Sequence, residues 1–306
     1  MYPLKIDLSE RTALNEPVGL KDHRRFASPL YRLGVKMFRY LLLAFAFLAI
    51  SDPVFAQVGA DLNISPKRVV FGPGERSATV YIFNQGDQPA TYSVELIDRV
   101  MMADGQIVAA ADHPETTVDS ARPLVQYTPR RITLQPRESQ AIRVRARPGG
   151  EGEHRSHLTV TALPPENAGF TVDQAAAGGD DVTLQVVALF SVSIPVIVRD
   201  GAVDARADID RVSLTHDGAQ TLLSLDLVRK GANSVYGDVE VFAEDAAGRR
   251  PLTAVRGVAV YPEVARRTVI AALPQGVASG QTLTIIYRDD DAEKGEVLAT
   301  TTLIAP

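Results

Sequence analysis

His154 and His157 are the residues most suited to metal binding or general base chemistry, because both carry imidazole rings. They lie three residues apart in a segment that has the pattern of a β-strand. Side chains three apart on a strand point to opposite faces, so the two rings cannot easily hold one metal ion. We therefore expect no histidine metal site.

An acidic cluster, Asp289–Glu296, has the sequence DDDAEKGE. It lacks the ligand spacing of a calcium-binding loop, so a solvated turn is expected there. The chain also has no Cys and no Gly-x-Ser-x-Gly motif, which removes thiol nucleophiles, cysteine zinc sites and the serine nucleophile elbow. We expect a protein that is not an enzyme and that needs no metal or cofactor.

Arg143, Arg145 and Arg147 form a basic row at alternate positions. The whole chain has 32 Lys and Arg against 37 Asp and Glu, a net charge of −5. On an acidic chain such a row is more typical of the solvent face of a strand than of a nucleic-acid surface. No nucleic-acid partner is expected.

The elements that carry these residues are expected to be strands. Apolar and polar residues alternate with a period of two at Ala78–Phe83, Ile142–Arg147 and Leu223–Val228, and Gly-rich turns separate such runs. No amphipathic helix of useful length is visible. The pattern predicts an all-β protein.

The length of 306 residues and a fresh series of strands after Arg199-Asp200-Gly201 predict two domains. Residues 57–199 and 200–306 are each suited to an immunoglobulin-like β-sandwich. The segment Pro164–Asp181 interrupts the first domain and is long for a connection, which is typical of a mobile or functional loop.

Residues 1–56 have the features of an N-terminal extension with an export signal. The ten apolar residues Leu41–Ile50 are too few to span a bilayer, follow Arg39, and precede Val54 and Ala56 at the −3 and −1 positions of a cleavage site. A buried helix or a membrane anchor is the alternative. Met37 is a candidate for the true start. Removing residues 1–56 leaves a net charge of −8, and we expect a periplasmic protein without stable membrane insertion.

A long alternating segment ends the first domain. Every even position from Val182 to Ile194 is apolar, whereas the odd positions are mixed. Taken alone, this pattern favours a buried central strand. An edge strand that offers its even face to another molecule is the alternative.

Three pieces of the first domain together resemble the PapD-like periplasmic chaperones of chaperone–usher pili. They are Ile64–Asn84 with its Gly-Pro-Gly-Glu turn, Pro129–Arg147, and Glu153–Pro165. The resemblance implies two immunoglobulin-like sandwiches in an L or boomerang arrangement. It also implies a chaperone that binds pilin subunits, lends each one a missing strand, and delivers it to an outer-membrane usher.

The resemblance also implies site residues. The donor strand corresponds to Leu184, Val186, Ala188 and Phe190. Arg68 corresponds to the basic residue that binds the C-terminal carboxylate of the subunit, a role that Lys67 could share or replace. The family has a second basic anchor, and its place falls on Pro195, which has no charge and no N–H and is expected to stop ladder pairing.

An inter-domain salt bridge is the last feature that the resemblance implies. Arg199 corresponds to its arginine, Glu153 to its acid on the first domain, and Asp290 to its acid on the second. Three independent surface charges are the alternative.

For the whole protein, two further functions stay open: a structural or adhesive surface protein of tandem sandwiches, and a secreted enzyme on a β scaffold. A self-capping homodimer is also left open.

Overall fold

The computed structural model describes residues 61–164, 189–217, 220–245, 248–274, 277–291 and 295–306. Residues 57–306 form one compact unit. The regular structure of the described residues is almost entirely β, with a 3₁₀ turn at Ala110–Asp112. Within these residues no helix is long and apolar enough to cross a membrane. The prediction of an all-β protein is confirmed.

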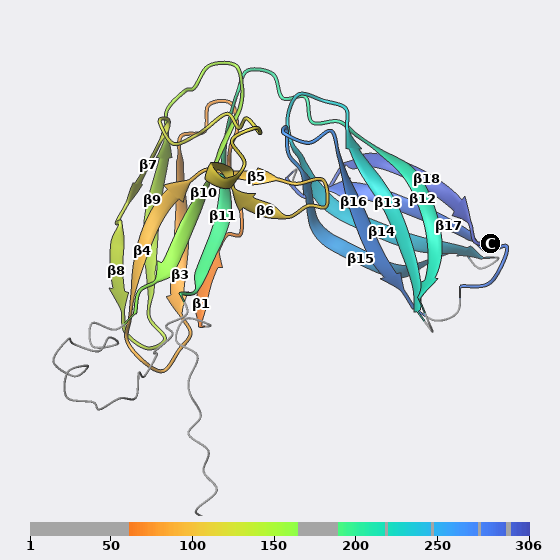
Figure 1. Ribbon diagram of the computed structural model, residues 1–306, viewed down its shortest axis with the longest axis horizontal. Coiled ribbons are helices and arrows are strands. Elements are labelled where there is room, and N and C mark those ends of the chain that lie inside the picture. The colour runs from red at the N-terminus through yellow and green to blue at the C-terminus, as the bar shows by residue number, and fades with distance from the viewer. Residues whose placement is uncertain (1–60, 165–188, 218–219, 246–247, 275–276, 292–294) are drawn as a thin grey trace, which may run out of the picture. The chain divides into compact units, whose positions relative to one another are not determined.

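The first sandwich has two sheets, with the strand orders β1-β3-β9-β7 and β2-β11-β10-β4-β8 (Figure 1). The strands of the first sheet are β1 (Leu62–Ser65), β3 (Ser77–Asn84), β9 (Ser139–Ala146) and β7 (Val125–Thr128). Those of the second are β2 (Val69–Phe71), β11 (Ser191–Asp200), β10 (Gly152–Ala162), β4 (Ala90–Ile97) and β8 (Arg131–Leu134). The chain changes sheets early, because β1 pairs with β3 whereas β2 pairs in parallel with β11.

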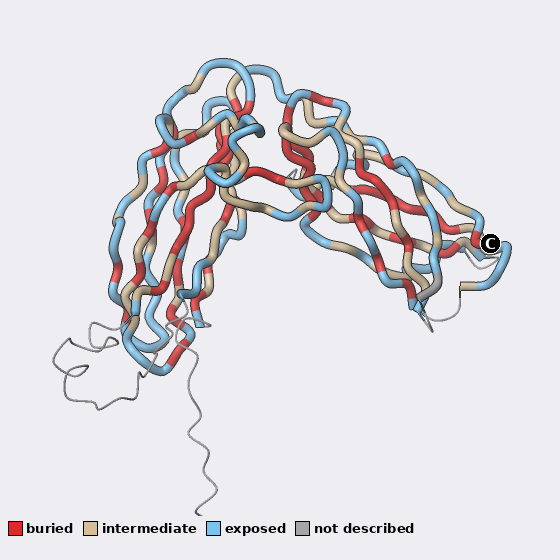
Figure 2. The backbone as a smooth tube through the Cα atoms, viewed as in Figure 1, coloured by how far each residue is buried: buried red, intermediate tan, exposed pale blue. Residues whose placement is uncertain are grey.

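Alternate burial along the strands explains why this sequence forms a sandwich. On β9, Ile142, Val144 and Ala146 are buried, whereas Arg143 and Arg145 between them are exposed. The same alternation of buried and exposed residues is visible along the strands of Figure 2. A period of two places all apolar side chains of a strand on one face, and two such faces close over a common core.

A small hairpin leaves the second sheet after β4. Its strands are β5 (Arg99–Met101) and β6 (Ile107–Ala109). Asp104 and Gly105 form the turn of this hairpin. Gly105 has a φ of 87°, which glycine adopts without strain, and Asp104 Oδ1 accepts a hydrogen bond from the Gln106 amide at 2.9 Å.

The second sandwich also has two sheets, with the orders β12-β13-β16 and β15-β14-β17-β18. Its strands are β12 (Ala207–Asp217), β13 (Gln220–Arg229), β16 (Arg266–Leu273), β15 (Gly248–Val260), β14 (Val235–Asp245), β17 (Thr282–Asp289) and β18 (Val297–Ile304).

Each sandwich has its own hydrophobic core. The buried residues of the first core run from Leu62 to Val198, and those of the second from Ile209 to Tyr287. The two cores therefore lie on either side of Arg199 in the sequence, and the prediction of two sandwiches is confirmed. The expected L-shaped arrangement stays a prediction.

Candidate functional site

The segment that was predicted to be a donor strand leads into β11. Leu184, Val186 and Ala188 lie outside the described residues, so of the four predicted donor positions only Phe190 is described. Phe190 is 38% exposed and its neighbour Leu189 is 59% exposed. Two large apolar side chains therefore stand partly in solvent immediately before β11.

The even-numbered side chains of β11 face the core of their own sandwich. Ile194, Val196 and Val198 are buried in that core, and Val192 packs against it. Because these side chains are already packed, the even face is closed to a partner from Ile194 onward. The large apolar side chains of this segment that stay exposed, Leu189 and Phe190, lie just before the start of β11.

The backbone of the first half of β11 has an open outer edge. The Ala162 amide of β10 donates a hydrogen bond to the carbonyl of Phe190 at 2.9 Å. Alternate residues of an antiparallel pair direct their N–H and C=O groups to the same neighbour. Given the continuous register of β10 and β11, the residues that face β10 are Phe190, Val192 and Ile194, and those that face outward are Ser191, Ser193 and Pro195.

The outer edge of β11 is covered only in its second half. There, β2 pairs in parallel with Val196–Val198. In the part of the chain that the structure describes, no strand pairs with the outer edge of Ser191–Pro195. A short, unpaired edge next to two exposed apolar side chains is an arrangement that can accept another strand.

Pro195 does not stop the ladder, and that prediction is wrong. β11 continues from Ser191 to Asp200, with Pro195 opposite His157 of β10. The ladder continues because the backbone nitrogen of Pro195 faces the outer edge of β11 and not β10. Because that nitrogen faces the outer edge, its missing N–H removes no hydrogen bond to β10, which is the situation in which sheets tolerate proline.

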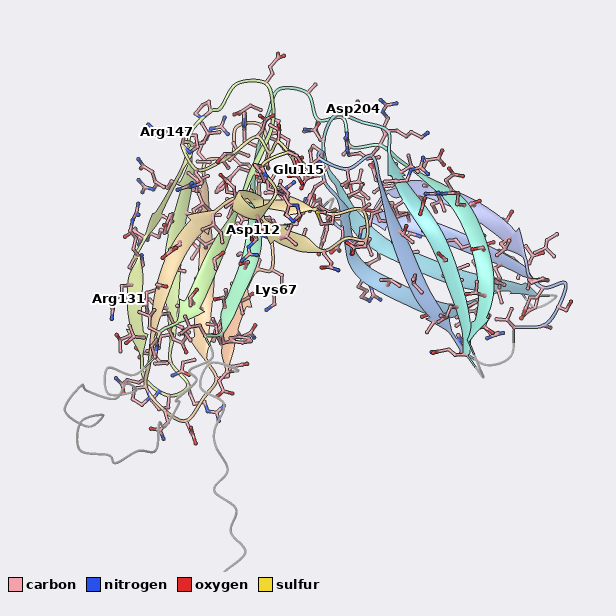
Figure 3. All side chains as sticks on the ribbon, viewed as in Figure 1. Lys67, Asp112, Glu115, Arg131, Arg147 and Asp204 are labelled. Atoms are coloured by element: carbon pink, nitrogen blue, oxygen red, sulfur yellow. The ribbon has the colours of Figure 1, made fainter. Side chains whose placement is uncertain are left out.

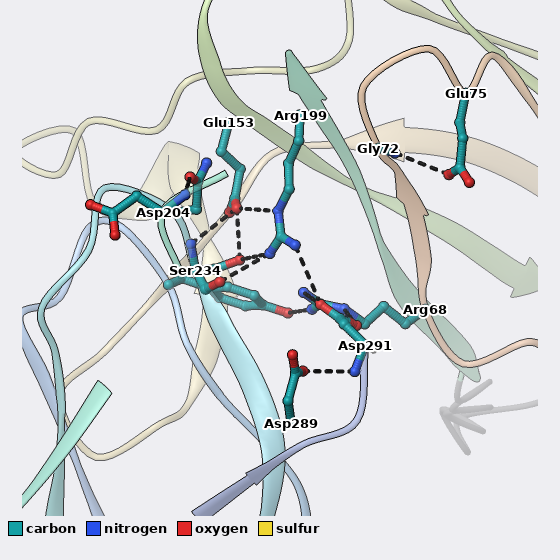
Figure 4. A network of polar contacts seen from close by, with 11 residues as sticks. Arg68, Gly72, Glu75, Glu153, Arg199, Asp204, Ser234, Asp289 and Asp291 are labelled. Carbon is teal, nitrogen blue, oxygen red and sulfur yellow. Dashed lines mark hydrogen bonds and ion pairs between the residues drawn. The ribbon is translucent and has the colours of Figure 1, made fainter. Parts of the chain in front are cut away.

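Arg68, which immediately precedes β2, is held by Asp291 of the second sandwich (Figure 4). Its Nε and Nη2 atoms donate to the two carboxylate oxygens of Asp291 at 3.0 and 3.1 Å. The guanidinium also lies 4.5 Å from the ring centre of Tyr236 and donates to the Tyr261 hydroxyl at 3.5 Å. Only 8% of the Arg68 side chain is exposed, so the predicted carboxylate anchor is occupied by a carboxylate of the same chain.

The charge of Arg68 is secure in these surroundings. Burial by itself would lower the pKa of Arg68, but the nearby Tyr261 phenol and Asp291 carboxylate outweigh burial and raise that pKa.

Lys67, unlike Arg68, is exposed. Its side chain projects from the protein beside β11 (Figure 3) and its ammonium donates to the Asn63 side-chain oxygen at 2.6 Å. Lys67 is therefore the more accessible of the two predicted anchor residues.

Arg199 and Glu153 are in contact, as the resemblance implied. Arg199 Nε donates to Glu153 Oε2 at 2.9 Å, and the backbone amide and hydroxyl of Ser234 donate to the same oxygen at 3.0 and 2.9 Å. The third charge belongs to Asp291, whose Oδ2 lies 3.6 Å from Arg199 Nη1. The resemblance implied Asp290 as this acid, but the carboxylate near Arg199 is that of the next residue, Asp291.

A second buried ion pair lies on the same face of β10 and was not predicted. Arg155 donates to both carboxylate oxygens of Glu263, at 2.5 and 3.0 Å, and each side chain is 2% exposed. Its guanidinium also lies 3.8 Å from the ring centre of Tyr261. The sequence could have indicated Arg155, because it lies two residues from Glu153 and therefore on the same face of the strand. Glu263, in the segment after β15, has no comparable local signal.

His157 is buried next to this ion pair, 6.4 Å from Tyr261 between ring centres. Burial, together with the charges of Arg155 and Arg99, lowers the pKa of His157 to about 3, so its ring is neutral at ordinary pH. Within the described residues no group of three His, Cys, Asp or Glu side chains is arranged to hold a metal ion.

Comparison with known proteins gives similarity at the level of solved structures. No family model and no curated protein matches the sequence. The E. coli chaperone DraB is 14% identical, with a TM-score of 0.40 and coverage of 80% of this chain and 96% of that chain. The YadV chaperone is 15% identical, with a TM-score of 0.41 and coverage of 79% of this chain and 100% of that chain. The chain is structurally similar to chaperone–usher pilus chaperones.

Several of the similar solved structures are complexes of a chaperone with a pilin or adhesin subunit. One is the CsuC–CsuE complex of a chaperone and a tip adhesion subunit from the archaic chaperone–usher Csu pili of Acinetobacter baumannii. This match has 15% identity and a TM-score of 0.41, and it covers 78% of this chain and 97% of that chain.

Proposed function

We propose that this protein is a non-enzymatic periplasmic chaperone that binds pilin-like subunits and supplies their missing strand from its own first sandwich. The observation that supports the proposal most strongly is the open outer edge of Ser191–Pro195, preceded by the exposed side chains of Leu189 and Phe190. An incomplete sandwich exposes both apolar groove and unpaired backbone groups, which make it prone to aggregate. A lent strand covers both.

The geometry of β11 determines which residues pair with the client through their backbone and which fill its groove with side chains. The outward N–H and C=O groups of Ser191 and Ser193 pair with a strand of the client. Because Ile194 is already packed, the apolar side chains that fill the client's groove come from the preceding positions, with Leu184, Val186, Ala188 and Phe190 as the proposed set. Backbone pairing tolerates different client sequences, which suits a chaperone.

The proposal places the C-terminal carboxylate of the client at Arg68 and Lys67. Arg68 already binds the carboxylate of Asp291, so the client's carboxylate must take the place of Asp291 on the same guanidinium. Lys67 is exposed and lies two residues before β2, at the end of the open edge. It therefore provides the first contact, after which the exchange at Arg68 can follow.

Two further steps belong to the proposal. The chaperone delivers the bound subunit to an outer-membrane usher, and the free protein can cap its own donor edge by forming a homodimer. The buried Arg199–Glu153 pair does not contact Arg68, so it can stay intact when the client carboxylate replaces Asp291 there.

A capture experiment tests the proposal. The mature protein is co-expressed with pilin-like subunits from its own genome, and capture is measured by co-purification. Phe190→Asn puts an unpaired amide into a dry groove, which costs about 1–3 kcal/mol, or roughly 5- to 150-fold in affinity. Ile270→Asn is the matched control, because Ile270 is 62% exposed and lies on β16, away from the donor segment.

The expected result is reduced capture by Phe190→Asn, normal capture by Ile270→Asn, and thermal stability close to that of the unchanged protein for both. Normal capture by a folded Phe190→Asn protein, or no capture of any pilin-like subunit by the unchanged protein, would contradict the proposal. The second outcome would favour the structural or adhesive alternative.

A further inference from the structure

The segment Arg122–Arg147, which includes β7, β8 and β9, carries a concentration of arginines that the proposed function does not use. From Arg122 to Arg147 the sequence contains seven arginines and one acidic residue, Glu138, although the chain as a whole has a net charge of −5. Arg131 and Arg147 project from this flank of the first sandwich in Figure 3. Such a local excess of positive charge attracts negatively charged groups.

Two of these arginines border a hollow. Arg143 and Arg145 project from the outer face of β9, opposite Thr128 and Gln126 of β7 in the strand register. A hollow of about 530 Å³ is lined by Val125–Thr128, Arg130, Arg143 and Arg145. The Arg130 guanidinium lies 4.9 Å from the ring centre of Tyr127, which holds a third positive charge at the border.

The arginines of this hollow are not neutralised by the protein. Arg130, Arg143 and Arg145 are exposed, and within the described ranges none of them forms an ion pair with an acidic side chain. By contrast, Arg155 and Arg199 are buried and are each paired with a glutamate. The hollow is therefore complementary to a ligand with at least two negative charges.

The backbone beside the hollow is also available. β7 is the last strand of its sheet. The Arg147 amide donates to the Leu124 carbonyl at 2.9 Å, so Gln126 and Thr128 direct their backbone groups to β9, whereas Tyr127 directs its own outward. An extended chain can thus pair with Tyr127 while its side chains enter the hollow.

We propose that this hollow binds an extended acidic segment of a partner protein, with alternate carboxylates on Arg143 and Arg145. In an extended chain, alternate side chains point to the same side, as these two arginines do on β9. A lipid membrane is also anionic, but it has no backbone that could pair with the open edge of β7. The combination of charge and an open backbone edge therefore favours a peptide.

The test uses the mature protein and a fluorescein-labelled ten-residue peptide of alternating Glu and Thr, with an alternating Lys and Thr peptide as the probe control. Binding is measured by fluorescence anisotropy at low and at physiological salt. The double variant Arg143→Gln/Arg145→Gln is compared with Arg249→Gln/Arg250→Gln, which removes the same charge from exposed positions on β15.

We expect the unchanged protein to bind the Glu peptide but not the Lys peptide, and the β9 variant to bind about tenfold more weakly than the β15 variant. Equal weakening by both variants would show that only net charge matters and would overturn the proposal. So would the absence of Glu-peptide binding at low salt. Tighter binding to vesicles with 30% phosphatidylglycerol, lost with Arg143→Gln/Arg145→Gln, would assign the face to membranes instead.

Discussion

The carboxylate of Asp291 binds the guanidinium of Arg68 through two hydrogen bonds, at 3.0 and 3.1 Å, although 223 residues separate the two in the sequence. The same carboxylate lies 3.6 Å from Arg199, so one acidic side chain bridges two arginines. The C-terminal carboxylate of a client offers the same pair of oxygens. Asp291 is therefore an internal competitor for the proposed anchor.

Removing this competitor is expected to strengthen client binding. Asp291→Asn leaves Arg68 with a weaker, neutral partner, so a client carboxylate has less to displace and its affinity should rise severalfold. Asp290→Asn is the matched control, because it removes the same charge one residue away. Affinity for a purified client is measured by calorimetry. If Asp291→Asn weakens binding instead, then Asp291 orders the anchor rather than competing for it.

The Arg155–Glu263 pair is expected to contribute to stability only as an intact pair. Glu263→Ala leaves a buried, uncompensated guanidinium and should lower the free energy of unfolding by about 3–5 kcal/mol. The double change Arg155→Met/Glu263→Leu should recover most of that loss, since neither charge then stays buried. Asp204→Ala removes one partner of an exposed ion pair and should change little. Urea denaturation curves give all three values, and equal effects of Glu263→Ala and Asp204→Ala would contradict the expected role of burial.

His157 is expected to make the protein less stable in acid. The pKa of His157 is about 3 in the folded protein and about 6.5 in the unfolded chain. Between these values the unfolded chain binds a proton that the folded protein does not. The free energy of unfolding therefore falls as the pH decreases from about 6.5, by up to about 1.4 kcal/mol per pH unit.

The contribution of His157 can be isolated by substitution. Denaturation between pH 7 and pH 4.5 should show a shallower loss of stability for His157→Gln than for the unchanged protein. His113→Gln is the control, because His113 lies beside exposed Glu115 outside the core. Parallel pH profiles for the unchanged protein and His157→Gln would show that other groups cause the acid sensitivity.

The strands were predictable from the sequence because their signal is local. Alternation alone places Ile142 and Val144 inside and Arg143 outside, and the same alternation puts Glu153 and Arg155 on one face of β10. Asp291 was missed by one position because it lies in a loop after β17, where no period relates sequence number to direction. There the resemblance could indicate an acidic loop but not which carboxylate turns toward Arg199.

Pro195 shows a different limit of sequence analysis. Its missing N–H is evident from the sequence, but the consequence depends on which edge of the strand that nitrogen faces. The hydrogen bond from the Ala162 amide to the Phe190 carbonyl determines which residues of β11 face β10 and which face outward. This bond joins two strands that are separated in the sequence by the long segment after Pro164. The contact between Arg68 and Asp291 likewise depends on the folded chain and has no local signature.

Export is expected to remove the N-terminal extension. The predicted signal, Leu41–Ile50, lies outside the described residues, and cleavage after Ala56 would leave a mature protein that begins at Gln57. N-terminal sequencing of protein from the periplasmic fraction checks this directly. Protein that keeps Leu41–Ile50, or that stays in the membrane fraction, would contradict the signal-peptide interpretation.

Amide hydrogen exchange of β11, with and without a bound client, tests the central claim most directly. In the free protein, the amides of Val192 and Ile194 should be protected by their bonds to β10, whereas those of Ser191 and Ser193 should exchange fast because they face the open edge. Client binding should protect Ser191 and Ser193 strongly and leave Val192 and Ile194 as they were. If Ser191 and Ser193 exchange equally fast in a stable client complex, the client does not pair with β11, and strand donation from this edge is wrong.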